Sequence, residues 1–171
     1  MNSNKALEYA TNKHRWQKRI GGDEYITHPM AVSNILKDLG YSPDVQIAGL
    51  FHDLLEDTDA AKEEILELSN AEVLEVVILL TKEEGYAINQ YMSRIKANEM
   101  AHMVKLADRL HNLTCAVYAD EKFKKKYIVE TQKYYIDLAA GTVFEAPIKR
   151  ALQDLIESTT NKKDEGSDTN I

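Results

Sequence analysis

Helix-breaking residues are scarce along this chain, and apolar residues recur at spacings of three and four. Only three prolines and seven glycines occur in 171 residues. A repeat of three and four places apolar side chains on one face of a helix, whereas a half-buried strand needs alternation at two. We find no strong strand pattern and no internal repeat. The sequence therefore predicts an all-α fold.

Capping residues and helix breakers divide the chain into segments. Pro29 suits the first turn of a helix, Gly40 suits a C-terminal cap, and Asn70 suits an N-terminal cap. Gly21 and Gly22 indicate a loop at about 15–27. We expect helices at about 3–14, 29–39, 42–58, 60–68, 70–80, 86–97, 99–118 and 121–140, and a last one after Pro147.

The length of 171 residues is enough for one domain with a sizeable core. From Ser158 onward the composition turns polar, with Ser, Thr, Asn, Lys, Asp and Gly in close succession. Such a segment buries too little apolar surface to fold by itself. We expect one domain at 1–158 and a disordered polar tail at 159–171.

The balance of charge restricts the partners. The formal net charge is −7, whereas a nucleic-acid-binding domain usually carries a basic face. An anionic small molecule would therefore need a local basic patch. One cysteine excludes an internal disulfide, and no apolar run reaches about 18 residues. We expect a cytoplasmic protein that binds neither nucleic acid nor membrane; the sequence does not indicate an oligomeric state.

Acidic residues and a histidine gather at the end of one apolar segment. His52 and Glu56 are four residues apart, and so are Asp53 and Asp57. On a helix each pair shares a face. Carboxylates in apolar surroundings need a partner or a cation. Either a metal ion or a surface-exposed helix end satisfies this requirement.

Two other segments supply residues of the same chemical kind. His28 stands at a helix start, where the dipole favours a neutral imidazole, although a simple cap explains it as well. Lys105, Asp108 and Asn112 share one helix face and could equally form a surface ion pair. Together, His28, His52, Asp53 and Asp108 suit Mn²⁺, Fe²⁺ or Zn²⁺ better than Mg²⁺ or Ca²⁺, which prefer oxygen ligands.

Four segments carry a resemblance to a known family, at residues 14–19, 25–29, 52–58 and 104–112. In their order and spacing they resemble the HD superfamily of metal-dependent phosphohydrolases. The resemblance is closer to the hydrolase domains of RelA/SpoT homologues and to the small alarmone hydrolases. It covers about residues 5 to 140 and implies a compact helical bundle of about eight to ten helices.

The resemblance also implies a chemistry. It implies one divalent ion, Mn²⁺ with Fe²⁺ or Zn²⁺ as alternatives, and a small-molecule nucleotide as substrate. That family hydrolyses the 3′-pyrophosphate of ppGpp and pppGpp. The implied metal ligands are His28, His52, Asp53 and Asp108. Glu56 and Asp57 match the acidic pair near the attacking water.

The remaining candidates are expected to contact the substrate. The resemblance implies Arg19 beside the guanine and Asn112 near the ribose and phosphates, and Lys18 and Lys105 are further candidates to bind phosphate. Two departures lie in the loop expected to contact the nucleoside: Ile20 where the family often has a basic residue, and Glu24 where it often has proline. An HD enzyme acting on another nucleotide, and a non-catalytic nucleotide-binding module, therefore remain alternatives.

Three minor expectations concern residues outside this set. We expect Trp16 to pack rather than stack on a ligand. Lys13 and Arg15, with Lys18 and Arg19, form a basic stretch that either attracts a polyphosphate or is a solvated helix end. The run of lysines at 122–126 is expected on a solvated helix surface.

Overall fold

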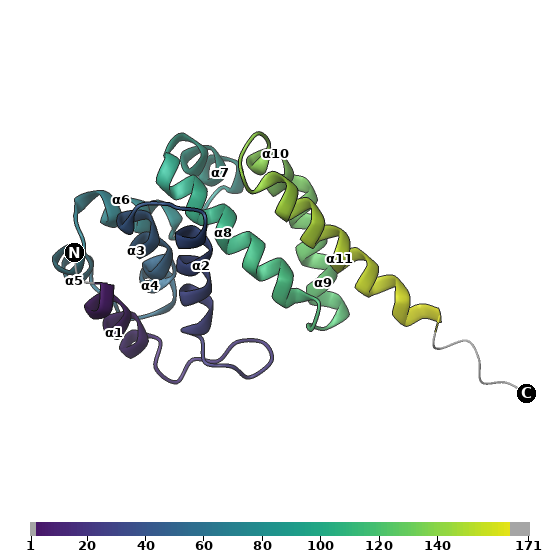
Figure 1. Cartoon of the computed structure of the whole chain (residues 1–171), viewed down its shortest axis with the longest axis horizontal. Helices are drawn as coiled ribbons and strands as arrows, with labels where there is room; N and C mark the ends of the chain where they lie inside the picture. Colours follow the sequence, from purple (N-terminus) through teal and green to yellow (C-terminus); the bar gives the residue numbers. More distant parts are fainter. Residues whose placement is uncertain (1–2, 165–171) are drawn as a thin grey trace, which may run out of the picture. The chain divides into compact units, whose positions relative to one another are not determined.

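The computed structural model describes residues 3–164, with side chains through residue 160. Its helices are α1 Ser3–Lys13, α2 Thr27–Asp38, α3 Pro43–Phe51, α4 Leu54–Asp57, α5 Lys62–Leu68, α6 Ala71–Leu80, α7 Ile88–Ala97, α8 Glu99–Ala116, α9 Glu121–Glu130, α10 Ile136–Ala139 and α11 Glu145–Asp164, with a π-helical turn η1 at Thr131–Tyr135 (Figure 1). Within 3–164, the only β-type pairing is an isolated bridge between Lys18 and Glu24. The prediction of an all-α fold is confirmed.

The chain divides into two compact units, one ending at Asp108 and one beginning at Arg109. The sequence predicted one domain at 1–158, and that assignment stays a prediction. Helix α11 continues through Asp164, past the expected domain end at 158, and the assignment of a tail also stays a prediction. The rest of the tail, from 165, lies outside the described residues. No helix in the described chain is long and apolar enough to cross a membrane.

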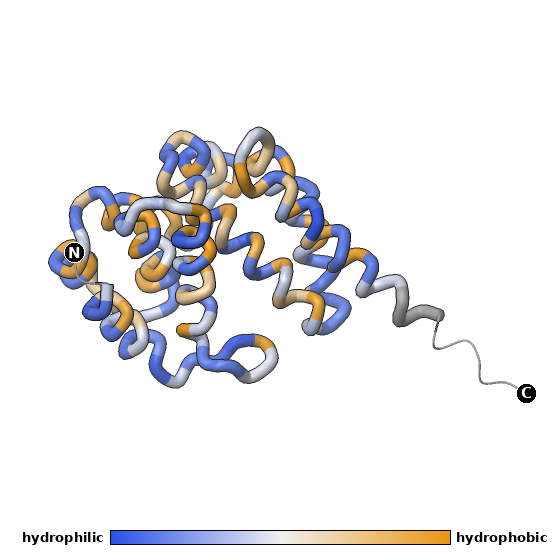
Figure 2. Tube along the Cα trace, viewed as in Figure 1, coloured by the Kyte–Doolittle hydropathy of each residue, from blue (hydrophilic) through white to orange (hydrophobic). Residues whose placement is uncertain are grey.

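The first unit is built around the contact between α2 and α3. Gly49 lies where the two helices approach: a Cβ there would meet Leu36 Cδ1 at 2.7 Å and Val32 Cγ1 at 3.3 Å. Helix α3 also packs on α1 and α6. Figure 2 shows apolar and polar residues alternating along these helices, as expected for helices that bury one face. This packing fixes the end of α3, where the acidic residues stand.

The helix predicted at 42–58 is interrupted. Helix α3 ends at Phe51 and α4 begins at Leu54. Between them, Asp53 adopts φ −100° and ψ −4°, and the His52 ring donates from Nδ1 to the Gly49 carbonyl oxygen at 2.7 Å. A side chain that bonds a helix carbonyl competes with the regular backbone ladder. The interruption therefore falls at the His-Asp pair.

In the second unit, α11 packs on α9 and α10. The predicted continuous helix at 121–140 contains the π turn, with Thr131 Oγ1 donating to the Tyr127 carbonyl at 2.6 Å. The expectation of solvated lysines at 122–126 was wrong for Lys124. Its side chain is buried, and its ammonium donates to Ser158 Oγ at 3.1 Å.

Candidate metal centre and acidic site

His28 reaches the site from the first turn of α2. Its backbone N–H donates to the Tyr25 carbonyl at 3.0 Å, and Pro29 follows in the first turn, where a missing N–H breaks no helix bond. The imidazole is buried. Burial lowers the pKa of His28, although Asp108 opposes the shift. The neutral imidazole, which can bind a metal, is therefore favoured.

His52 is oriented by its bond to Gly49. Because Nδ1 donates to that carbonyl, the other nitrogen, Nε2, points toward the carboxylates. Nε2 is buried and lacks a hydrogen-bond partner, although Asp53 Oδ2 lies 3.1 Å away. Burial would lower the pKa of His52, but the charges of Asp53 and Asp108 raise it to about 9. A cation bound there would replace that proton.

Four ligand-type atoms from distant parts of the sequence converge. His28 Nε2 lies 3.2 Å from Asp108 Oδ1 and 3.7 Å from Asp53 Oδ2. His52 Nε2 lies 3.8 Å from the same Asp108 oxygen. The ligand atoms of His28, His52 and Asp108 all lie within 4.8 Å of one another. The structure thus brings together the four residues that the sequence suggested as ligands.

The two shorter separations, 3.1 and 3.2 Å, match those around a divalent transition ion, and the two longer ones, 3.7 and 3.8 Å, exceed them by a few tenths of an ångström. Zn–N and Zn–O bonds of about 2.0–2.2 Å place neighbouring ligand atoms roughly 3.0–3.5 Å apart. The unpartnered, buried Nε2 of His52 is a second indication, because buried polar atoms are rarely left unpaired. Two imidazoles and two carboxylates are also the donor types that such ions take. The group therefore fits one ion.

Lys105 lies behind Asp108 rather than on the surface. Lys105 is only 6% exposed, and its Nζ donates to Asp108 Oδ2 at 2.9 Å. Burial would raise the pKa of Asp108, but the Lys105 ammonium and His28 hold it well below its usual range. Asp108 is therefore ionised and oriented, with Oδ2 on Lys105 and Oδ1 toward the imidazoles.

Asp57 is linked to the ligand cluster through Tyr25. The Tyr25 hydroxyl lies 2.7 Å from Asp53 Oδ2 and 2.9 Å from Asp57 Oδ2. Burial and the nearby Asp53 charge raise the pKa of Asp57. The His52 imidazole instead holds the pKa of Asp53 below its usual range, although burial opposes this. Two carboxyls one helical turn apart thus differ in proton affinity, which suits different roles.

Glu56, the other acidic candidate, faces a different partner. Lys82 approaches it with its ammonium, 3.0 Å from Oε1, and with its backbone N–H, 3.0 Å from Oε2. The ammonium also lies 5.9 Å from the centre of the Tyr91 ring. Glu56 and Asp57, adjacent in sequence, are therefore held by separate parts of the fold.

The basic loop at 14–26 borders this site. The Arg19 guanidinium lies 5.7 Å from the centre of the Tyr25 ring. Lys18 is exposed, with Nζ 4.0 Å from Glu24. Lys13 is engaged elsewhere, 3.2 Å from Asp59 and 3.0 Å from Glu64. Of the basic stretch, Arg19 is thus the residue in contact with a side chain of the site.

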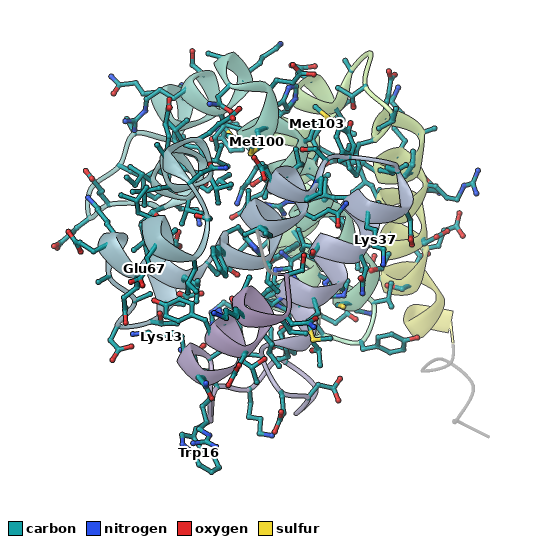
Figure 3. All side chains as sticks on the ribbon, turned by 60° about the vertical axis from the view of Figure 1, so that its left-hand side comes forward. Lys13, Trp16, Lys37, Glu67, Met100 and Met103 are labelled. Carbon is teal, nitrogen blue, oxygen red and sulfur yellow. The ribbon has the colours of Figure 1, made fainter. Side chains whose placement is uncertain are left out.

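Trp16 does not pack, so that expectation was wrong. It is 87% exposed, and Figure 3 shows its side chain pointing away from the neighbouring helices. Its φ of +74° is in the left-handed region, which costs a non-glycine residue energy.

Asn112, the candidate expected near the ribose and phosphates, lies one turn beyond Asp108 on α8 and belongs to the second unit. It is half-buried.

Sequence reasoning missed the roles of several neighbours. Tyr25 was part of a noted segment but had no assigned role, and Lys82 lies outside the four segments that carry the resemblance. Gln17 donates from Nε2 to the Asp57 carbonyl at 2.6 Å and accepts from His14 Nδ1 at 2.8 Å. The position of Tyr25 three residues before His28 is the one signal that could have indicated it.

Comparisons with known proteins match the part of the chain that contains these site residues. The profile of a family described as HD domain matches residues 6–142. The chain is 33% identical over 160 residues to a GTP pyrophosphokinase of Streptomyces coelicolor, covering 88% of this chain and 19% of that protein. It is 34% identical over 163 residues to the guanosine-3′,5′-bis(diphosphate) 3′-pyrophosphohydrolase of Spiroplasma citri, covering 88% and 22%. It thus spans about a fifth of the length of these curated relatives.

A solved structure is similar over nearly its whole length. It is described as a metazoan ortholog of SpoT that hydrolyzes ppGpp and plays a role in starvation responses. The TM-score is 0.76 at 25% identity, and the match covers 88% of this chain and 93% of that one.

Proposed function

Because the chain belongs to the HD-domain family, we propose that it is a metal-dependent phosphohydrolase acting on ppGpp. The products are GDP and pyrophosphate. The observation that carries the proposal is the convergence of His28, His52, Asp53 and Asp108 beside two further acids. A buried imidazole nitrogen that faces two carboxylates and makes no hydrogen bond of good geometry is unusual in a purely structural core.

In this proposal the four converging residues hold one ion, Mn²⁺, with Fe²⁺ or Zn²⁺ as alternatives. When bound, the ion supplies Lewis-acid charge that polarises a phosphoryl oxygen and makes water more acidic. His52 would bind through Nε2, since its Nδ1 donates to Gly49, and His28 would bind through the Nε2 that faces Asp108. Lys105 keeps Asp108 ionised and oriented for the same purpose.

Asp57 is the proposed proton acceptor. A raised carboxyl pKa brings a base closer to neutral pH, where general-base catalysis is most effective. One water proton passes to Asp57, and the water oxygen forms a bond to the phosphorus next to the ribose. The bond from that phosphorus to the ribose 3′ oxygen breaks, and the 3′ oxygen takes up a proton. Glu56, fixed by Lys82, supports the same water.

Cationic groups would bind the substrate. Arg19 and Lys18 stand on the loop at 14–26, and their charge counters the net charge of −7. Lys105 is buried and donates to Asp108, so its charge orients that carboxylate rather than contacting the phosphates. Asn112 can donate from its amide to a phosphate or ribose oxygen. Arg19, Lys18 and Asn112 would together bind the phosphates and ribose of a nucleotide substrate.

Hydrolysis is better supported than synthesis. The pyrophosphokinase relatives are matched over about a fifth of their length, whereas the solved structure whose description names ppGpp hydrolysis is matched over 93% of its own.

One observation favours a second candidate function, hydrolysis of another nucleotide. Ile20 is 63% exposed and apolar in the loop where a basic side chain would contact guanine.

The test is a product assay on a panel of nucleotides with added Mn²⁺. We expect wild type to convert ppGpp to GDP and pyrophosphate, and the Asp53→Asn variant to be inactive. Shortening at the 5′ end would refute the regiochemistry. Turnover of another nucleotide without turnover of ppGpp would support the second candidate, and no turnover of any nucleotide by the metal-loaded protein would leave the non-catalytic alternative.

A further inference from the structure

One hydroxyl joins a candidate metal ligand to the candidate base. Tyr25 lies 2.7 Å from Asp53 Oδ2 and 2.9 Å from Asp57 Oδ2. A phenol carries one hydrogen, so at any moment it donates to one of the two carboxylates. Both carboxylates lie close enough to accept that hydrogen bond in turn. Two carboxylates that share one donor repel each other when both are ionised. The shared donor offsets that repulsion and keeps the two carboxylates together.

The Tyr25 ring is itself held in place. It stacks on His14 with a centroid distance of 4.8 Å and an interplanar angle of 30°. The Arg19 guanidinium lies 5.7 Å from the ring centre, and the His28 ring meets it edge-on at 6.2 Å. A ring with three such neighbours has little freedom to turn, so its hydroxyl stays aimed at the acids.

The backbone of Asp57 is held by the same loop. Gln17 donates from Nε2 to the Asp57 carbonyl oxygen at 2.6 Å. His14, only 2% exposed, donates from Nδ1 to Gln17 Oε1 at 2.8 Å and thereby fixes which end of the amide faces Asp57. The loop therefore contacts Asp57 at its carbonyl through Gln17 and at its carboxylate through Tyr25.

We propose that Tyr25 is a positioning residue that holds the Asp57 carboxylate beside Asp53, with His14 and Gln17 bracing the same segment. The proposal rests on the proposed function for its kinetic consequences only. The hydroxyl contacts Oδ2 of Asp57 and leaves the other oxygen, Oδ1, available to accept the proton of the attacking water. Arg19 is a proposed substrate-binding residue and also lies against the Tyr25 ring, so a substrate bound at Arg19 would lie next to the residue that positions Asp57.

The test removes the hydroxyl and keeps the ring, in Tyr25→Phe. The matched control is Tyr9→Phe, because Tyr9 also donates to a carboxylate, Glu64 Oε2 at 2.8 Å, away from the acidic site. We expect kcat for ppGpp to fall about ten-fold or more in Tyr25→Phe, as for loss of a hydrogen bond to a charged group. KM and bound metal should stay as in wild type, and Tyr9→Phe should keep its kcat.

Two kinetic outcomes would overturn the inference. One is an unchanged kcat in Tyr25→Phe. The other is a loss of kcat together with bound metal, which would mean that Tyr25 acts through the ligand Asp53. If Tyr25→Phe does not fold, Gln17→Leu tests the other half of the brace: lower kcat with unchanged metal supports it, and unchanged kcat overturns it.

A crystal structure of Tyr25→Phe gives a readout that needs no substrate. We expect the Asp57 carboxylate to turn away from Asp53. If wild type hydrolyses no ppGpp, the proposed function fails while this measurement still decides on Tyr25. An Asp57 side chain in the same place and rotamer in both proteins would overturn the positioning role whatever the substrate is.

Discussion

Lys82 holds Glu56 at both carboxylate oxygens. Its ammonium lies 3.0 Å from Oε1, and its backbone N–H donates to Oε2 at 3.0 Å. Lys82 follows α6 by two residues, so the position of this helix end sets the position of the Glu56 side chain. Glu56 and Asp57 therefore depend on different neighbours, Lys82 for one and Tyr25 for the other.

Replacing Lys82 by Met should disturb Glu56 with little loss of stability. The pair is partly exposed, and such ion pairs contribute only about 0.2–1 kcal/mol. We expect the melting temperature to change little and kcat for ppGpp to fall several-fold, because Glu56 is no longer fixed. The control is Lys149→Met, which loses an ion pair with Glu145 of 2.6 Å on α11. Equal kcat values in the two variants would contradict the role of Lys82.

Removing one imidazole should release the metal. Wild type is expected to carry about one transition ion per chain, and His52→Ala to carry almost none, because Nε2 would supply one of the ligand bonds. His102→Ala, which changes a histidine on α8 in the first unit, serves as the control. Elemental analysis of the purified proteins measures this. Equal metal content in His52→Ala and wild type would disprove the ligand assignment.

Glu64 should make stability depend on pH in acid. The Ala61 backbone N–H, Lys13 and Tyr9 lower the pKa of Glu64 from 4.5 to about 2. A lowered folded-state pKa stabilises the fold above the unfolded pKa, and this contribution is lost as pH falls from about 4.5 toward 2. Glu64→Gln should therefore be less stable than wild type at neutral pH, and the gap should close in acid.

Urea unfolding at neutral pH and at several acidic pH values measures that gap. Glu67→Gln is the control, since Glu67 is exposed on the same helix α5. Its stability relative to wild type should not vary with pH in the same way. A gap for Glu64→Gln that stays constant across the acidic range would show that the carboxylate charge does not stabilise the fold.

Trp16 should be a strained position. Its φ of +74° costs an L-residue about 1–2 kcal/mol, and its exposed indole adds little packing. Trp16→Gly should raise the free energy of unfolding above that of Trp16→Ala by up to about 1 kcal/mol, after the extra entropy of glycine in the unfolded chain is subtracted. Denaturant unfolding compares the two. If Trp16→Ala is as stable as Trp16→Gly, the strain is absent; if both fall well below wild type, the indole packs.

The sequence by itself determined the local features. Apolar spacing predicted the helices, and Asn70 caps α6 as expected, accepting from the Val73 N–H at 2.9 Å. These features follow from interactions within about one helical turn, which a sequence pattern records directly. The same holds for the ligand types: His52 and Asp53 could be proposed as metal ligands from their kind and order.

Only the tertiary structure decided which side chains meet. Lys105 was expected to bind phosphate, but its ammonium lies on Asp108, and Tyr25 proved to contact Asp57 from 32 residues away. Periodicity gives the face of each helix and leaves open which faces pack together, because that choice depends on the burial of the whole core. The Gly49 contact between α2 and α3 is one such choice, and it brings His28 and His52 together.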